Sequence, residues 1–173
     1  MYGAVGMSGA ATGSLGTPSP TLPLSDGGSQ LILRGRCVVP GVAEGIALVT
    51  TQRISGWGGV DPRTGTVVET RHELRGQSFA GRVLVFPGAK GSSGWSAQFH
   101  VARLMGKAPA AWLFTEMTTK IALGTVVSRA PAMTDFDGDP LAVICTGDHV
   151  RVDATAGVVI VTRPFDTSGR TQA

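Results

Sequence analysis

An apolar run at residues 83–87 leads directly into a turn rich in glycine and serine, residues 88–96. A short apolar run bounded by turn residues is typical of a buried strand. The segment 96–105 that follows has helical spacing, with Phe99 and Leu104 on one face. A strand, a Gly/Ser turn and a helix N-terminus in succession bring backbone N–H groups and serine hydroxyls into one small space. Such a space suits an anion or a developing oxyanion.

Other apolar segments predict a strand-rich domain with one or two helices. The predicted strands are 31–39, 44–51, 66–70, 82–86, 110–115 and 131–134, and a short helix or turn is expected at 120–128. Residues 146–153 and 157–162 are typical of a terminal hairpin. Because the strand at 82–86 is followed by a helix and then by another strand, this unit predicts a parallel crossover. The expected fold class is therefore α+β and β-rich, as a small barrel or a layered β/β/α fold.

The 173 residues are expected to form one domain between two tails. Residues 1–29 are mainly Gly, Ser, Thr, Pro and Ala with almost no charge, a composition that cannot offset the entropy lost on ordering the chain. We expect a flexible tail there, a folded domain at 30–163 and a frayed polar tail at 164–173. The charged fraction of 16% is low and favours a surface covered by a partner, although a Gly- and Ala-rich composition has the same effect.

Charge and hydropathy argue against two classes of function. The net charge is +3 and the basic residues are scattered, without a Lys/Arg run interleaved with aromatics, so no nucleic-acid partner is expected. No segment is long and apolar enough to span a bilayer, and no signal peptide is visible, so we expect a cytoplasmic protein without a membrane partner. Cys37 and Cys145 each stand alone, without metal-ligand spacing, and are expected to be buried reduced thiols.

Six sequence motifs follow one another along the chain. They are 40–49 (PGVAEGIALV), 55–65 (SGWGGVDPRTG), 74–78 (LRGQS), 81–93 (GRVLVFPGAKGSS), 107–111 (KAPAA) and 147–153 (GDHVRVD). In this order they resemble the swivel domain of aconitase X, and the resemblance runs from about residue 31 to residue 162. The block Gly-Gly-Val-Asp-Pro-x-Thr-Gly is long and specific. The resemblance implies the swivelling β/β/α fold of the aconitase superfamily.

The same resemblance implies a hydro-lyase that dehydrates a small hydroxy acid. In this family a swivel domain works with a large catalytic part, and a chain of this length resembles the separate small subunit, which is active only with its large partner. The resemblance implies that the large partner carries an iron–sulfur cluster on its own cysteines, so no metal or cofactor is expected on this chain. Known family activities are dehydration of cis-3-hydroxy-L-proline and of mevalonate 5-phosphate. Of these two substrates we expect cis-3-hydroxy-L-proline first.

The functional serine of the family maps onto Ser92, the first serine after Lys90 and Gly91. The resemblance implies that Ser92 is the base that removes the α-proton of the substrate. Backbone N–H groups of the glycine turn, with Lys90 close in sequence, would stabilise its alkoxide. The residues expected to bind the substrate or an oxyanion are Lys90, Gly91, Ser93, Gly94 and Ser96. An alternative is that these serines only cap the following helix.

Trp95 stands where family members usually have a small residue, often glycine. A large indole beside the turn would reshape the substrate pocket, or mark a different substrate or a loss of catalysis. Together with the long N-terminal tail, Trp95 supports an alternative function. In that alternative the chain is a stand-alone binding or assembly module that keeps the fold without the chemistry.

A second loop, at residues 56–65, carries the other candidate site residues, Trp57, Gly58, Gly59, Asp61 and Arg63. Asp61 followed by proline is typical of a turn whose carboxylate accepts local N–H groups. Alternatively, the loop lies at the active site or at the interface with the large subunit. Trp57, flanked by glycines, is expected to be a packing anchor or an interface aromatic.

Other polar residues have structural interpretations that we prefer. His72 and His100 are candidates for general acids, but surface or structural histidines are more common. Asp135, Asp137 and Asp139 lie close together but lack the twelve-residue pattern ending in glutamate that an EF-hand requires. A solvated acidic loop is therefore expected at these three positions.

Overall fold

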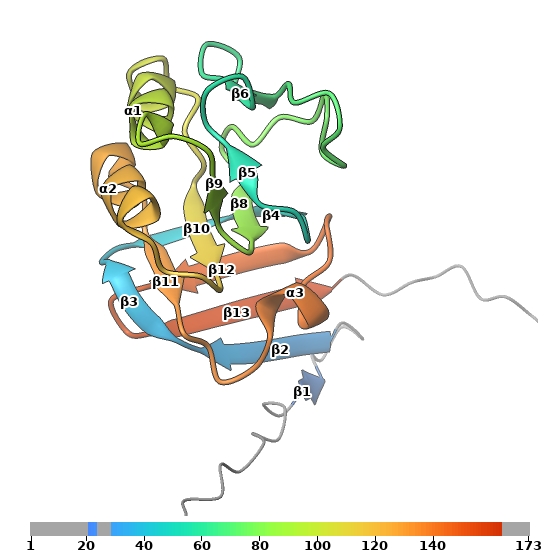
Figure 1. Cartoon of the computed structure of the whole chain (residues 1–173). Helices are drawn as coiled ribbons and strands as arrows, with labels where there is room; N and C mark the ends of the chain where they lie inside the picture. The colour runs from blue at the N-terminus through green and yellow to red at the C-terminus, as the bar shows by residue number, and fades with distance from the viewer. Residues whose placement is uncertain (1–20, 24–28, 164–173) are drawn as a thin grey trace, which may run out of the picture.

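The computed structural model describes residues 21–23 and 29–163 (Figure 1). The tails predicted at 1–29 and 164–173 lie outside these described residues, apart from β1 (Thr21–Pro23) and the first residue of β2 (Ser29–Arg34). The remaining strands are β3 (Arg36–Val39), β4 (Val42–Val49), β5 (Ile54–Ser55), β6 (Val60–Asp61), β7 (Thr66–Val67), β8 (Val83–Phe86), β9 (Ala89–Lys90), β10 (Ala111–Phe114), β11 (Ala132–Thr134), β12 (His149–Asp153) and β13 (Val158–Arg163). The helices are α1 (Trp95–Leu104), α2 (Thr119–Ser128) and α3 (Pro140–Val143).

The described strands form two small sheets, β5-β9 and β6-β7, and one large mixed sheet, in the order β1-β2-β13-β12-β4-β8-β10-β11-β3. β4, β8, β10 and β11 run parallel to one another, whereas the other neighbours in this sheet are antiparallel. The predicted parallel crossover is confirmed, because β8 and β10 pair in parallel and α1 connects them. The predicted terminal hairpin is also confirmed, as β12 and β13.

Gly35 joins β2 to β3, two strands that lie far apart in the strand order. β2 pairs with β13 and with the end strand β1, whereas β3 is the strand at the other end and pairs with β11. The single strand expected at 31–39 is therefore wrong. A Cβ at position 35 would lie 2.6 Å from the Phe136 ring, so only glycine allows this close approach at the break between β2 and β3.

Alternate residues of the central strands belong to two hydrophobic cores. On β8, Leu84 and Phe86 pack in the core that contains helix residues, whereas Val83 and Val85 pack with residues of β12 and β13. β10 follows the same alternation, and all four of its residues are buried. This is the pattern of a strand covered on both faces. The predicted α+β, β-rich class is confirmed, with α1 and α2 side by side on one face of the curled sheet (Figure 1).

α1 begins at Trp95 and buries Trp95, Phe99 and Ala102, which recur at helical spacing. Phe99 lies on the buried face as predicted, but Leu104 is 65% exposed, so its predicted place on that face is wrong. Leu104 follows Ala102 by two residues, about 200° around the helix, and therefore points away from the sheet. No helix in the described part of the chain is long and apolar enough to cross a membrane.

Candidate functional site

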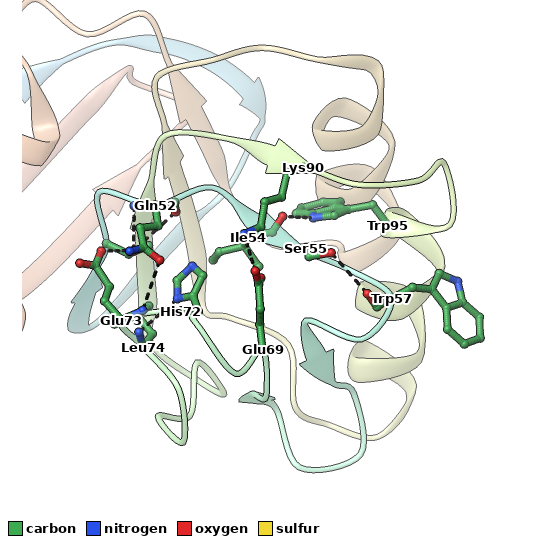
Figure 2. Close-up of polar contacts among 11 residues, drawn as sticks. Gln52, Ile54, Ser55, Trp57, Glu69, His72, Glu73, Leu74, Lys90 and Trp95 are labelled. Carbon is green, nitrogen blue, oxygen red and sulfur yellow. Dashed lines mark hydrogen bonds and ion pairs between the residues drawn. The ribbon is translucent and has the colours of Figure 1, made fainter.

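The two loops singled out in the sequence start from the same place in the structure. β5 pairs in parallel with β9, with Ile54 opposite Ala89 and Ser55 opposite Lys90. Because both strands run in the same direction, the Gly/Trp loop after β5 and the Gly/Ser turn after β9 leave the pair at the same edge. The structure thus brings together two motifs that are far apart in sequence (Figure 2).

Glycines allow the loop and the turn to touch. A Cβ at Gly91 would lie 3.1 Å from Ser55 Oγ, and one at Gly94 would lie 2.5 Å from Trp57 Nε1. Gly91 also has a φ of +89°, in the region that favours glycine. The exposed Ser92 lies beside this contact, since its Oγ would be 3.6 Å from a Cβ at Gly94. Ser92, Gly94 and Trp57 therefore share one small area of surface.

No serine of the turn caps α1. The N-cap residue is Gly94, and no side chain accepts a hydrogen bond at this helix end. Ser92 and Ser93 are exposed, whereas Ser96 is buried in the first turn of the helix. The backbone N–H groups of residues 92–94 donate to no acceptor among the described residues. The capping alternative is therefore wrong, and the exposed Ser92 and Ser93 lie next to the N-terminus of α1, the positive end of the helix.

The ammonium group of Lys90 forms an ion pair with Glu69 and not a contact with Ser92. Its Nζ lies 2.5 Å from Glu69 Oε1, and Figure 2 shows the side chain extended toward that carboxylate. The second carboxylate oxygen of Glu69 is buried without a hydrogen-bond partner among the described residues. The cation that contacts the turn is Lys120 instead, whose ammonium donates to the carbonyl oxygen of Gly91. Sequence reasoning missed Lys120, because it lies 29 positions from Gly91 and in no recognisable motif.

Trp95 belongs to the hydrophobic core and does not line the turn. Its side chain is fully buried, its Nε1 donates to the carbonyl oxygen of Ile54 at 2.9 Å, and its ring centroid lies 4.4 Å from that of Phe99. The indole is therefore not available to line a surface beside the turn. Trp95 points inward because Gly124 on α2 leaves room for its ring, since a Cβ at Gly124 would lie 2.3 Å from Trp95 Cζ3.

The Asp61 carboxylate organises its own turn, as the first alternative predicted. Oδ1 accepts the backbone N–H of Arg63 at 3.0 Å, and Oδ2 accepts the hydroxyl of Thr64 at 3.1 Å. The hydrogen bond from the Arg63 backbone is the main reason that the pKa of Asp61 is lowered from its ordinary value. The Arg63 side chain is largely exposed. Trp57 is 69% exposed and its indole projects outward in Figure 2, so it is not an anchor of the core of this chain.

Two of the three histidines, His72 and His100, were candidates for general acids, and they lie in different environments. His72 is buried, and its Nδ1 accepts the backbone N–H of Leu74 at 3.1 Å. Its Nε2 has no hydrogen-bond partner in the described part of the chain. His100 is exposed on α1, with Nε2 at 3.3 Å from Arg103 Nη2. Neither histidine hydrogen-bonds to residues 90–94.

The acidic loop is held by structural contacts. Asp135 forms an ion pair with Arg36 at 2.7 Å, and Asp137 accepts the backbone N–H of Arg34 at 2.9 Å. Asp139 caps α3 by accepting the backbone N–H of Leu141.

The described residues contain no group of three or more His, Cys, Asp or Glu side chains that could hold a metal ion. Cys37 is half-buried and Cys145 is exposed, and both are free thiols, so the prediction that both are buried is wrong. Cys145 lies in the loop before β12 and has Arg163 Nη2 at 3.5 Å from its Sγ. An iron–sulfur cluster does not fit on the part of this chain that the structure describes.

The fold is a curled mixed sheet with helices on one face, which is a β/β/α domain. Its Gly/Ser turn lies at the N-terminus of α1. Residues 32–161 match the family model described as the aconitase X swivel domain, so the chain belongs to this family.

Among curated relatives, the phosphomevalonate dehydratase small subunit of Methanocella arvoryzae is 40% identical over 73% of this chain and 96% of its own length. The protein of the same name from Thermococcus kodakarensis is 42% identical over 73% of this chain and 93% of its own length. The crystal structure of Thermococcus kodakaraensis aconitase X in its holo-form matches with a TM-score of 0.71 and 40% identity, covering 75% of this chain and 97% of that one. The predicted family, the swivel fold and the class of dehydratase subunit are confirmed by these comparisons.

Proposed function

We propose that this chain is the small subunit of an aconitase X-type hydro-lyase that dehydrates mevalonate 5-phosphate, with Ser92 as the base. The observation that carries the proposal is the parallel β5–β9 pair, which sets the Gly/Trp loop against the turn that exposes Ser92. The names of the relatives favour mevalonate 5-phosphate over cis-3-hydroxy-L-proline, the substrate expected first from the sequence.

In the proposed reaction, Ser92 removes a proton from the α-carbon, which is bonded to the substrate carboxylate. The electron pair of that C–H bond forms the new double bond, and the β-hydroxyl leaves as water after gaining a proton. A serine hydroxyl is a weak base unless its alkoxide is stabilised. Here the N–H groups of residues 92–94, which donate to no acceptor among the described residues, the positive end of α1 and the nearby Lys120 ammonium would favour negative charge on Ser92.

The large subunit would complete the site. We propose that it carries the iron–sulfur cluster, which supplies a Lewis acid for the departing hydroxyl when bound. Trp57 is a large exposed aromatic beside the Ser92 turn, and aromatics of this kind are common at the centres of interfaces. We therefore place the face with Trp57 and Ser92 against the large subunit. The module alternative loses one of its two supports, because Trp95 is a core residue.

The test is turnover by the complex of this chain with its large subunit, purified after co-expression. Ser92→Ala should lower kcat by about 10²–10⁴-fold for mevalonate 5-phosphate, the range that a positioned acid or base contributes, while the complex still assembles. Lys107→Met is the control, since Lys107 is exposed beyond the opposite end of α1, and it should retain most activity. Full activity of the Ser92→Ala complex would refute the assignment of the base. Turnover of cis-3-hydroxy-L-proline alone would refute the substrate.

A further inference from the structure

Lys120 lies at a position in α2 where a lysine is unfavourable for the stability of the helix. It is the second residue of α2, whose N-cap is Thr118, and the first turn of α2 contains no acidic residue. The N-terminus of a helix carries partial positive charge, so a lysine there is electrostatically unfavourable. The side chain therefore needs another partner to explain its place.

That partner is the backbone of the Ser92 turn. The half-buried Lys120 side chain crosses from α2 and its ammonium donates to the carbonyl oxygen of Gly91. The other lysines of the chain do not serve this turn. Lys90 is paired with Glu69, and Lys107 is exposed beyond the opposite end of α1.

Holding the Gly91 carbonyl also sets the direction of the Ser92 amide. The carbonyl of Gly91 and the N–H of Ser92 belong to one planar trans peptide, so they point to opposite sides. With the carbonyl turned toward Lys120, the N–H of Ser92 is directed to the other side of the turn. Gly91 has a φ of +89°, a backbone conformation that glycine adopts at low cost. No other group among the described residues donates to the Gly91 carbonyl oxygen, so removing the ammonium removes the hydrogen bond that holds this peptide.

We propose that Lys120 is a positioning residue for Ser92. It orients the Gly91–Ser92 peptide and places a positive charge next to the residue that must become an alkoxide. This inference rests on the proposed function of Ser92, and it adds a residue from a different element, α2, to the machinery of the turn.

The test compares three variants in the complex with the large subunit. Lys120→Met keeps the aliphatic stem but removes the ammonium, and should lower kcat by about 10²-fold, the scale of a small misplacement of a reacting group. KM should stay within about two-fold, because Lys120 acts on the base and not on the substrate. Lys120→Arg keeps a charged donor and should restore much of kcat. Lys107→Met is the matched control and should behave as the wild type.

The pH profile separates positioning of Ser92 from a purely structural effect. If Lys120 stabilises the deprotonated serine, Lys120→Met should shift the pH dependence of kcat/KM toward higher pH, whereas a general loss of stability would lower activity at every pH. Wild-type kcat and an unshifted profile in an assembled Lys120→Met complex would overturn the inference. If Lys120→Met does not assemble, the comparison of Lys120→Arg with Lys120→Gln, a donor without charge, replaces it. Equal kcat values in that pair would likewise overturn the role of the charge.

A readout without activity separates this inference from the proposed function. The ¹⁵N–¹H signal of Ser92 in the full chain should shift in Lys120→Met and stay unchanged in Lys107→Met, because only the first change releases the Gly91 carbonyl. An unmoved Ser92 signal would overturn the positioning role even if the complex proves active. A wild-type complex that dehydrates neither substrate would refute the proposed function. That outcome would leave the orientation of the Gly91–Ser92 peptide by Lys120 intact.

Discussion

Glu73 is an exposed carboxylate that organises the loop after β4. Its Oε1 accepts hydrogen bonds from the Thr50 hydroxyl, from the Thr51 backbone N–H at 2.7 Å and from the Thr51 hydroxyl at 3.3 Å. These donors stabilise the ionised form, and the Thr50 hydroxyl is the largest cause of a pKa of Glu73 lowered from its ordinary value of 4.5. The ionised carboxylate therefore contributes to stability above pH 4.5, and that contribution is lost as the pH falls through the lower pKa of the folded state.

Glu73→Gln should reduce this acid sensitivity. The variant should be less stable than the wild type near neutral pH, and the difference in the free energy of unfolding should shrink as the pH is lowered below about 4.5. Urea unfolding at several pH values measures this difference. Glu44→Gln on β4 is the control, since its exposed carboxylate accepts no hydrogen bond from the described residues. A constant difference between wild type and Glu73→Gln at all pH values would contradict the assignment.

For single residues, the sequence predicted the conformation and exposure of those whose surroundings are formed by a local motif. The turn made by Asp61 follows from an aspartate before proline, and the exposure of Ser92 follows from a Gly/Ser turn. The inward direction of Trp95 and the contact of Lys120 with Gly91 depend on α2, which follows the turn by more than twenty residues. No local pattern encodes such contacts.

α1 and α2 approach closely at Gly124 and the ring of Trp95, and Arg103 Nε of α1 also donates to the carbonyl oxygen of Val127 of α2 at 2.8 Å. A glycine inside a helix normally lowers stability, and alanine would be preferred there by about 1 kcal/mol. At position 124, however, a Cβ would lie 2.3 Å from Cζ3 of a fully buried indole that also packs against Phe99 and Trp112. Packing therefore outweighs helix propensity at this contact.

Gly124→Ala should destabilise the domain, by about 1–3 kcal/mol, the usual cost of inserting a methyl group into a packed core. Chemical denaturation of the isolated chain measures this change. Leu123→Ala on the exposed side of the same helix should change stability by no more than about 0.5 kcal/mol. A Gly124→Ala variant as stable as the wild type, or more stable, would show that the indole has room to move.

The sequence predicted which segments are helices or strands better than it predicted where these elements end or which of their faces is buried. Apolar residues at helical spacing predict α1, whereas the segment of α2 is expected only as a short helix or turn. The terminal hairpin forms because two alternating segments flank a short loop. The face of α1 was predicted only in part, because Leu104 is apolar yet points away from the sheet. The strand expected at 31–39 is two strands, since the break at Gly35 results from the path of the whole sheet.

At the scale of the whole molecule, the path of the chain through Gly35 connects distant strands of the large sheet. This residue joins β2 to β3 and its N–H donates to the carbonyl oxygen of Gly157 at 3.1 Å. The Phe136 ring fills the space where a side chain would be. A Cβ at this point would therefore force the Phe136 ring or the backbone between β2 and β3 to shift.

Gly35→Ala should lower the free energy of unfolding by about 1–3 kcal/mol, because the added methyl group meets an aromatic ring. In a Phe136→Ala background the same change should cost less, and a double-mutant cycle measures that coupling. Gly138→Ala is the control, since a Cβ there would lie 3.4 Å from Leu33 Cδ2, an ordinary contact distance. Equal costs of Gly35→Ala in the two backgrounds would mean that the Phe136 ring is not the obstacle.

The sequence by itself determined the class of this protein, because motifs spread over most of the domain and two buried strands around a helix specify a swivel-type β/β/α fold. It also identified the Gly/Ser turn, since a turn is encoded by the residues that form it. Only the tertiary structure decided which cation serves that turn, where Trp95 points and how the sheet closes. These features arise from contacts between segments distant in sequence, whose geometry is set by packing and not by local conformational preference.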